Sequence, residues 1–239
     1  MAQISNEELI KTACDMINTK RSAQRIRGAK LIRKHALVAL GEQLYAAFLR
    51  ELKDARTWEV KSEMLKALGV INFTAATGEI EKIVARNLPQ EAVTDSAACA
   101  LAMLRRSHKN DASEIIRLLK TGSYSALIGA VTVLTVDQMI PCEAEILEIL
   151  KLTKDAHKHK DRQGSEFGLI DPRTYVAAAC ANWLGGSEAQ NEAVRQWLHH
   201  CKLTAVYRNS FGEERVDLRL IQICDLALKG KFPKAYVGF

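Results

Sequence analysis

The residue types best suited to chemistry gather in one stretch, KDAHKHKDRQGSEFGLIDPR, at positions 154–173. His157 and His159 stand two residues apart, and closely spaced imidazoles can bind a metal ion. Four lysines or arginines precede Gln163, and their charge would repel a cation and attract an anion. We therefore expect no metal here, and retain as candidate binding residues His157, His159, Arg162 and Phe167.

A second cluster, HHC at positions 199–201, also contains metal-ligating residue types. Adjacent residues on a helix point about 100° apart, so the three side chains cannot all face one ion. The six cysteines are scattered without a CxxC pair, and Cys99, Cys180 and Cys224 lie in apolar helical runs. We predict that these thiols pack in the core as small apolar groups, and we expect no metal and no cofactor.

A run of positive charge, KRSAQRIRGAKLIRKH, holds seven Lys or Arg and no acidic residue between Lys20 and Lys34. On a helix, Lys20, Arg27, Lys30 and Lys34 would fall within an arc of about 80°. Such a stripe suits nucleic-acid phosphates or an acidic protein, and it also suits a solvated outer face. The net charge of the chain is +6, so the remaining sequence has no positive excess.

A late segment, TAVYRNSFGEER at positions 204–215, carries aromatic and basic residues outside the helical runs. We expect it to be a surface loop, like the stretch that contains His157. Tyr and Arg are favoured as interface anchors, so Tyr207, Arg208 and Phe211 are candidate binding residues. The alternative is that both loops are tolerated insertions with their aromatic side chains packed against neighbouring helices.

Catalytic motifs are missing from the sequence. No G-x-S-x-G, G-x-x-x-x-G-K-[ST], G-x-G-x-x-G or H-E-x-x-H occurs, and the acidic residues are spread over solvent faces of predicted helices. We therefore name no catalytic residue and expect the protein not to be an enzyme.

The elements that position these residues are helices, because helical periodicity runs through nearly the whole chain and hairpin signals are nearly absent. An apolar pattern in VKSEMLKALGVI recurs at a spacing of 33 residues, and a second helix follows each copy. The copies start at Val60, Val93 and Ala126, and their second helices carry Ile83, Ile116 and Ile149. A fourth copy starts at Val176, 50 residues after Ala126, so an insertion separates the last two copies.

One domain over residues 1–239 is the organisation that this spacing predicts. In order, it comprises an N-terminal helix (1–19), a first repeat (20–56), three regular repeats (57–156), an insertion loop (157–170), a further repeat (171–203) and a loop, closing helix and tail (204–239). Small residues such as Ala67, Gly69, Ala100 and Ala102 should let neighbouring helices approach closely.

The helix pairs resemble short bacterial HEAT repeats, whose pattern is roughly V-R-x-x-A-x-x-A-L-G-x-I after an Asp- or Pro-containing turn. VKSEMLKALGVI matches this pattern, and DPRTYVAAACANWLGG matches through its turn and its Leu-Gly. The arginine position departs from the pattern, with Lys61, Thr94 and Ala177 in successive copies. The resemblance covers about residues 20–229. It implies an all-α fold, a single right-handed α-solenoid of about six helix pairs that serves mostly as a binding surface.

The function we expect is therefore non-catalytic protein binding, as in a bacterial inhibitor or a toxin-neutralising immunity protein. The alternative is a nucleic-acid-binding HEAT-like protein, which includes an alkylpurine DNA glycosylase-like enzyme, because a bacterial family of these glycosylases is similar in length and uses HEAT-like repeats. No local motif of this sequence matches the catalytic residues of that family. Trp183 and Trp197 occupy positions typical of packing. Without a signal peptide or an apolar run of membrane-spanning length, a cytoplasmic location without membrane contact is expected.

Overall fold

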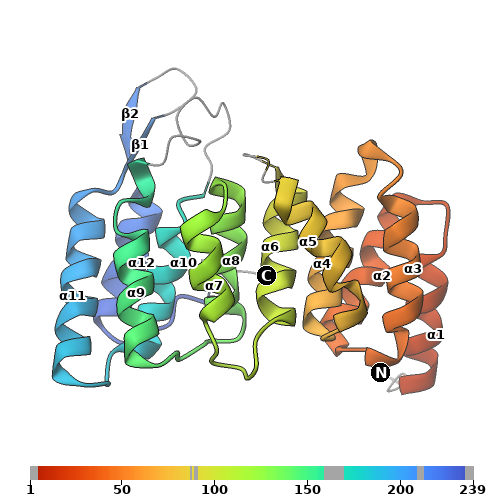
Figure 1. The fold of residues 1–239 in the computed structure, drawn as a ribbon, viewed down its shortest axis with the longest axis horizontal. Helices are drawn as coiled ribbons and strands as arrows, with labels where there is room; N and C mark the ends of the chain where they lie inside the picture. Colours follow the sequence, from red (N-terminus) through yellow and green to blue (C-terminus); the bar gives the residue numbers. More distant parts are fainter. Residues whose placement is uncertain (1–4, 87, 89–90, 159–169, 209–212, 235–239) are drawn as a thin grey trace. The chain divides into compact units, whose positions relative to one another are not determined.

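The computed structural model describes residues 5–86, 88, 91–158, 170–208 and 213–234. Over these residues the chain is helical apart from one two-stranded hairpin, which confirms the all-α class (Figure 1). The α-helices are α1 (Asn6–Ile17), α2 (Ser22–His35), α3 (Gly41–Glu51), α4 (Trp58–Val70), α5 (Thr77–Arg86), α6 (Ala92–Leu104), α7 (Ser113–Thr121), α8 (Tyr124–Val136), α9 (Glu143–Thr153), α10 (Arg173–Trp183), α11 (Glu188–Leu203) and α12 (Leu218–Leu228). The strands are β1 (Val206–Arg208) and β2 (Glu214–Val216), and short 3-10 turns are η1 (Val38–Leu40), η2 (Ala55–Thr57), η3 (Thr74–Ala76) and η4 (Ala156–Lys158).

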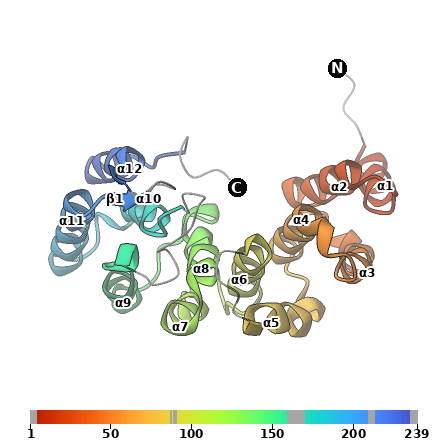
Figure 2. The ribbon, with the colours of Figure 1, turned by 90° about the horizontal axis from the view of Figure 1, so that it is seen from above.

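The chain divides into two compact units, unit 1 with α1 to α6 and unit 2 with α7 to α12. In unit 1, α2, α4 and α6 follow one another side by side, while α3 packs against α4 and α5 against α6 (Figure 2). The first helix, α1, packs against α2 and also contacts α3. Each apolar helix face is thus covered by a neighbour, as helices of this length require.

The core of unit 1 repeats at the predicted spacing of 33 residues. Matching positions of α4 and α6 are buried: Met64 and Ala97, Ala67 and Ala100, and Leu68 and Leu101 are all at most 1% exposed. The apolar pattern therefore placed the inward face of both helices correctly.

Small residues set how closely the helices of unit 1 approach. A Cβ atom added to Gly69 of α4 would lie 2.9 Å from the Cα atom of Ala100 on α6. A Cβ atom on Gly28 of α2 would lie 2.8 Å from Cγ2 of Ile17 on α1. The predicted close approach through small residues is confirmed for α4 and α6.

Unit 2 also has two layers of helices. α8, α10 and α12 lie side by side in one layer, and α7, α9 and α11 in the other (Figure 2). Trp183 of α10 is 1% exposed, and its Nε1 donates a hydrogen bond to the carbonyl oxygen of Met139 at 2.8 Å. Trp197 of α11 is also buried, so both tryptophans pack in the core as predicted.

Local signals explain where several helices begin and end. At α1, the Ser5 Oγ accepts a hydrogen bond from the Glu8 N–H at 3.2 Å, and Glu8 accepts one from the Ser5 N–H at 3.1 Å. Pro172 directly precedes α10, where its missing N–H is not needed. Gly185 follows the end of α10 with a φ of 121°, a conformation that suits glycine at a helix end.

Two local expectations differ from the structure. In α7 the buried isoleucine is Ile115, 1% exposed, whereas the predicted Ile116 is only half-buried. Adjacent residues on a helix differ by about 100°, so only one of the two can point directly into the core. The basic stripe also starts later than predicted, because α2 begins at Ser22 and Lys20 lies in the turn before it.

The segment 204–215, expected to be a loop, contains strand structure. Strands β1 and β2 pair antiparallel, with Val206 opposite Val216 and Tyr207 opposite Arg215. The β-branched and aromatic residues at these pairs favour the extended conformation. At three residues each, the strands are too short to show a clear alternation in the sequence.

We predict that Leu101→Ala lowers the free energy of unfolding by about 2–5 kcal/mol, because it leaves a cavity beside α4. Urea denaturation followed by circular dichroism measures this loss. Leu203→Ala is the matched control, since the side chain of Leu203 is 86% exposed. A loss below about 0.5 kcal/mol for Leu101→Ala would contradict the assigned register.

Candidate binding surfaces

The positive charges of α2 and of the two residues before it separate into two sets. Arg25 and Arg33 are largely buried and pair with carboxylates, Arg25 Nε with Glu51 Oε1 at 2.8 Å and Arg33 Nη1 with Glu63 Oε2 at 3.4 Å. The other five cations are exposed, and no ion pair is recorded for them within the described ranges. We call this set the basic face: Lys20, Arg21, Arg27, Lys30 and Lys34.

All four residues of the predicted stripe belong to this basic face. Arg27, Lys30 and Lys34 lie three and four residues apart on α2, so they project from one side of the helix. Lys20 precedes the helix, and its carbonyl oxygen accepts a hydrogen bond from Arg25 Nη1 at 2.8 Å. The two arginines of α2 that point inward are those with acidic partners.

Apolar side chains are exposed around the hairpin of unit 2. The exposed fractions are 86% for Leu203 at the end of α11, 36% for Tyr207 in β1, 55% for Val216 in β2 and 65% for Leu218 at the start of α12. We call these four residues the C-terminal apolar surface; within it, Tyr207 and Val216 project from opposite faces of the hairpin, because Tyr207 is paired with Arg215 and Val216 with Val206. Only Tyr207 among them was singled out in the sequence. The others were missed because isolated Leu and Val residues at helix ends carry no sequence signal for exposure.

A buried ion pair holds the base of this surface. Arg173 and Asp171 both have fully buried side chains, and Arg173 Nη2 lies 2.7 Å from Asp171 Oδ2. The same guanidinium donates to the Thr204 Oγ1 at 2.7 Å and to the Thr204 carbonyl oxygen at 3.1 Å. Its partner Asp171 also raises the pKa of Arg173 against the lowering effect of burial. We call Asp171, Arg173 and Thr204 the buried clamp, which fixes the end of α11 against the start of α10.

The hairpin begins directly beyond the buried clamp. Ala205 is 2% exposed, and its carbonyl oxygen accepts a hydrogen bond from the Asp217 N–H at 2.7 Å. This bond closes the base of β1 and β2, so the start of α12 is tied to the end of α11. The exposed side chains of the hairpin therefore stand on a fixed base.

His157, a predicted candidate, packs next to His200 of α11. Their ring centroids are 6.5 Å apart, and His200 Nε2 lies 4.0 Å from Asp155 Oδ1. Burial, followed by repulsion from Arg173, lowers the pKa of His157 to about 4. Burial and then Lys154 lower the pKa of His200 as well. Both rings are thus held neutral near pH 7 as part of the packing between η4 and α11.

Other predicted features can be placed only in part. His159, Arg162, Phe167 and Phe211 lie outside the described residues, and of Arg208 only the backbone in β1 is described. In the 199–201 cluster, His199 is exposed, His200 is half-buried and Cys201 is buried. Across the described ranges, no three His, Cys, Asp or Glu side chains are grouped so that they could hold a metal ion.

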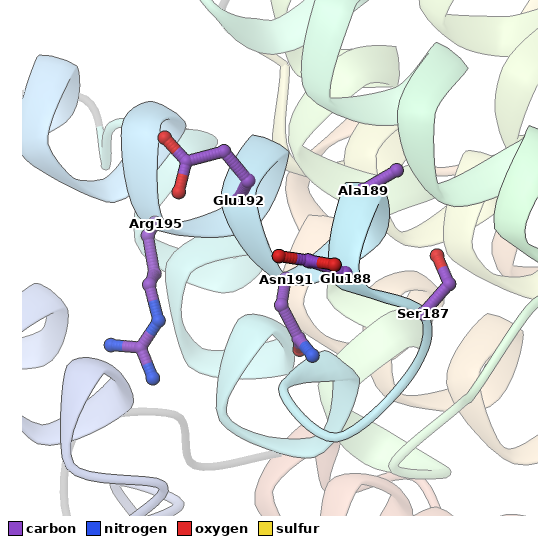
Figure 3. Close-up of a pocket in the computed structure, with 6 residues that line it drawn as sticks. All are labelled: Ser187, Glu188, Ala189, Asn191, Glu192 and Arg195. Atoms are coloured by element: carbon purple, nitrogen blue, oxygen red, sulfur yellow. The ribbon is translucent and has the colours of Figure 1, made fainter.

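A shallow hollow at the start of α11 was not anticipated from the sequence (Figure 3). Its lining residues are Ser187, Glu188, Ala189, Asn191, Glu192 and Arg195. Ser187 Oγ accepts from the Gln190 N–H at 3.1 Å, and Asn191 Oδ1 accepts from the Gly185 N–H at 2.8 Å. Figure 3 shows Glu192 and Arg195 pointing in different directions. The polar groups of the hollow mainly cap the helix and do not converge on one point.

Asp95 of α6 has the most perturbed carboxyl group of unit 1. Burial raises its pKa to about 7, and attraction by Lys66 of α4 works against this rise. Lys66 itself pairs with Glu63 at 3.4 Å. No sequence signal marked Asp95. Burial and Lys66 are thus the two influences on the pKa of this carboxyl group.

Three thiols of unit 2 lie in the core, one each on α10, α11 and α12. Cys180, Cys201 and Cys224 are all free and buried, as predicted for Cys180 and Cys224. Burial raises the pKa of all three, to about 12 for Cys224, and the thiols also influence one another. They are therefore protonated at neutral pH and behave as packing groups.

No protein-family model, curated protein or solved structure matches this chain. Within the described part of the chain, no helix is long and apolar enough to cross a membrane.

We predict that Arg173→Met lowers the free energy of unfolding by about 3–5 kcal/mol, because it leaves Asp171 charged and buried without its partner. Chemical denaturation measures the loss. The double variant Asp171→Asn with Arg173→Met should recover part of it, since no charge then stays buried. Arg215→Met, whose ion pair with Glu213 is exposed, is the control and should leave unfolding unchanged. An equally small effect of Arg173→Met would contradict the role of the clamp.

We further predict that His157 makes the protein less stable in acid. The folded-state pKa of about 4 lies below the usual value of 6.5, so unfolded chains bind more protons between these values. The stabilisation from neutral His157 is complete above pH 6.5 and is lost as the pH falls towards 4. The difference in unfolding free energy between the wild type and His157→Gln should shrink over this range. A pH-independent difference for His157→Gln would refute the prediction.

Proposed function

We propose that this protein is a non-catalytic protein-binding module whose contact site includes the C-terminal apolar surface. The observation that carries the proposal is the exposure of Leu203, Tyr207, Val216 and Leu218 within 16 residues of sequence. Scattered apolar residues are common on protein surfaces, and the proposal rests on four large ones that are close in sequence around one hairpin.

The base under this surface supports the proposal. Thr204 is held by Arg173, and Asp217 is bonded to Ala205, so little backbone ordering should be needed when a partner binds. Binding to a fixed surface avoids part of the entropy loss that flexible loops incur.

The chemistry around Tyr207 indicates the kind of partner. Tyr207 pairs across the hairpin with Arg215, and both residue types are frequent at interface centres. Arg215 also forms an ion pair with Glu213 at 2.6 Å, which places charges of both signs near Tyr207. This mixture suits a protein partner with an apolar groove and a polar rim.

The use of ionisable groups also favours binding over catalysis. Asp171 and Arg173 neutralise each other, and His157 and His200 are kept neutral by burial. Burial also raises the pKa of Asp95, and Lys66 opposes the rise. Packing thus accounts for the perturbation of these groups.

For the architecture, we favour a single right-handed α-solenoid of about six HEAT-like helix pairs. Its support is the spacing of 33 residues, which continues from Ala100 in unit 1 to Val133 in unit 2. Among solenoid functions, we favour a bacterial inhibitor or an immunity protein that occludes its target. The chain is itself basic, with a net charge of +6, which argues against a strongly basic target.

We predict that the triple variant Tyr207→Ala, Val216→Ser and Leu218→Ser loses binding to the native partner by at least about tenfold. The partner is first isolated by affinity purification from the native cell, and its dissociation constant is then measured with purified proteins by calorimetry. Each substituted side chain is exposed, so the variant should keep its helicity and its melting temperature.

Val38→Ser is the matched control, because Val38 is 65% exposed, as Leu218 is, but lies in unit 1. It should bind the partner like the wild type. If the triple variant also binds with unchanged affinity, the contact site lies elsewhere and the proposal fails.

A further inference from the structure

The outward side of α2 carries positive charge alone. Arg27, Lys30 and Lys34 fall within about 60° of one another around the helix axis, and Ala23 is the other helix residue in this arc. No acidic residue occurs between Asp15 and Glu42 in the sequence. The two nearest carboxylates that contact α2 side chains, Glu51 and Glu63, already pair with inward-pointing arginines. The charge of the basic face is therefore left uncompensated by its own helix or by these partners.

We propose that the basic face binds the phosphate backbone of a nucleic acid without regard to base sequence. The axial distance is about 4.5 Å from Arg27 to Lys30 and about 6 Å from Lys30 to Lys34, given the rise of a helix. One strand of duplex DNA presents a phosphate about every 3.4 Å along its axis. The three side chains thus extend along roughly three phosphate steps.

The helix that carries this charge is held firmly. Gly28 packs so closely against Ile17 that even a Cβ atom would collide, and Ala29 and Ile32 are fully buried. Contacts with α1 and α4 fix α2 from two sides. The cations therefore project from an ordered backbone, and only their flexible side chains need to adjust to phosphates.

The composition of the basic face favours phosphate over a protein or a membrane. None of the large exposed apolar side chains in the described part of the chain lies on α2. A protein interface would need apolar or aromatic anchors at its centre, and none is present on this face. A membrane-surface helix would need a free apolar face, but α2 buries its own against α1 and α4. Point charges alone are sufficient for phosphate contacts.

The test compares two variants that remove the same net charge. The first, Arg27→Gln with Lys30→Gln and Lys34→Gln, neutralises the basic face. The second, Lys53→Gln with Lys109→Gln and Lys229→Gln, neutralises three exposed lysines elsewhere. Binding of the full chain to a fluorescent 16-base-pair duplex is measured by anisotropy at several salt concentrations.

The wild type should bind the duplex at low salt regardless of its sequence. The first variant should bind at least about tenfold more weakly, and the slope of log K against log salt should become shallower by about 0.9 for each phosphate that the variant no longer neutralises. The second variant should keep the wild-type slope. The folding of each variant is confirmed by its melting curve.

Three results would overturn the proposal. The first is an unchanged slope in the first variant, and the second is an equal loss in both variants, which would indicate a nonspecific effect of net charge. The third is wild-type binding to vesicles that contain anionic lipid without binding to the duplex. The C-terminal apolar surface is unaltered in the first variant, so its binding to a protein partner should persist and can be assessed separately.

Discussion

The buried pairing of Arg173 with Asp171 is the interaction on which the C-terminal half of unit 2 depends. A charge in the protein interior is costly unless a partner and hydrogen bonds compensate it. Here the guanidinium has both, because it pairs with Asp171 and donates to the side chain and backbone of Thr204. The bonds of Arg173 to Asp171 and Thr204 require that α10 and α11 keep this relative position. It therefore fixes where the hairpin emerges.

The same charge acts on its surroundings. Positive charge at Arg173 helps to keep His157 neutral, and it opposes the rise in the pKa of Cys201. One ion pair thus links the packing of η4, the core of α11 and the base of the hairpin. In unit 1, the pairs of Arg25 with Glu51 and Arg33 with Glu63 act in a similar way, because they anchor α2 through its inward side.

Much of the fold follows from the sequence because apolar spacing determines which helix faces are buried. The positions from Met64 to Leu68 and their counterparts 33 residues later were assigned correctly for this reason. Ile116 was assigned wrongly, since periodicity cannot distinguish adjacent isoleucines by one residue. The hairpin was missed because strands of three residues give too short a pattern. The solenoid itself stays a prediction.

The candidate sites were less predictable than the helices. A charge run in the sequence indicated the basic face, but not that Arg25 and Arg33 turn inward, because their partners Glu51 and Glu63 are distant in the chain. Asp171 was noted only as part of the turn in DPRTYVAAACANWLGG, and its pairing depends on the packing of α10. Exposure of Leu203 and Leu218 likewise depends on tertiary structure. Residue type alone would have placed both leucines in the core.

The three buried thiols of unit 2 have a consequence for how the protein responds to its chemical environment. Only a thiolate reacts readily with alkylating agents and oxidants, and burial keeps Cys180, Cys201 and Cys224 both protonated and shielded. Each thiol comes from a different helix, so all of them gain reactivity only when α10, α11 and α12 separate. Their modification rate would then be governed by how often this part of the fold opens. The modification of these cysteines would therefore report transient opening of this part of the fold, whereas Cys14 of unit 1 is already partly exposed.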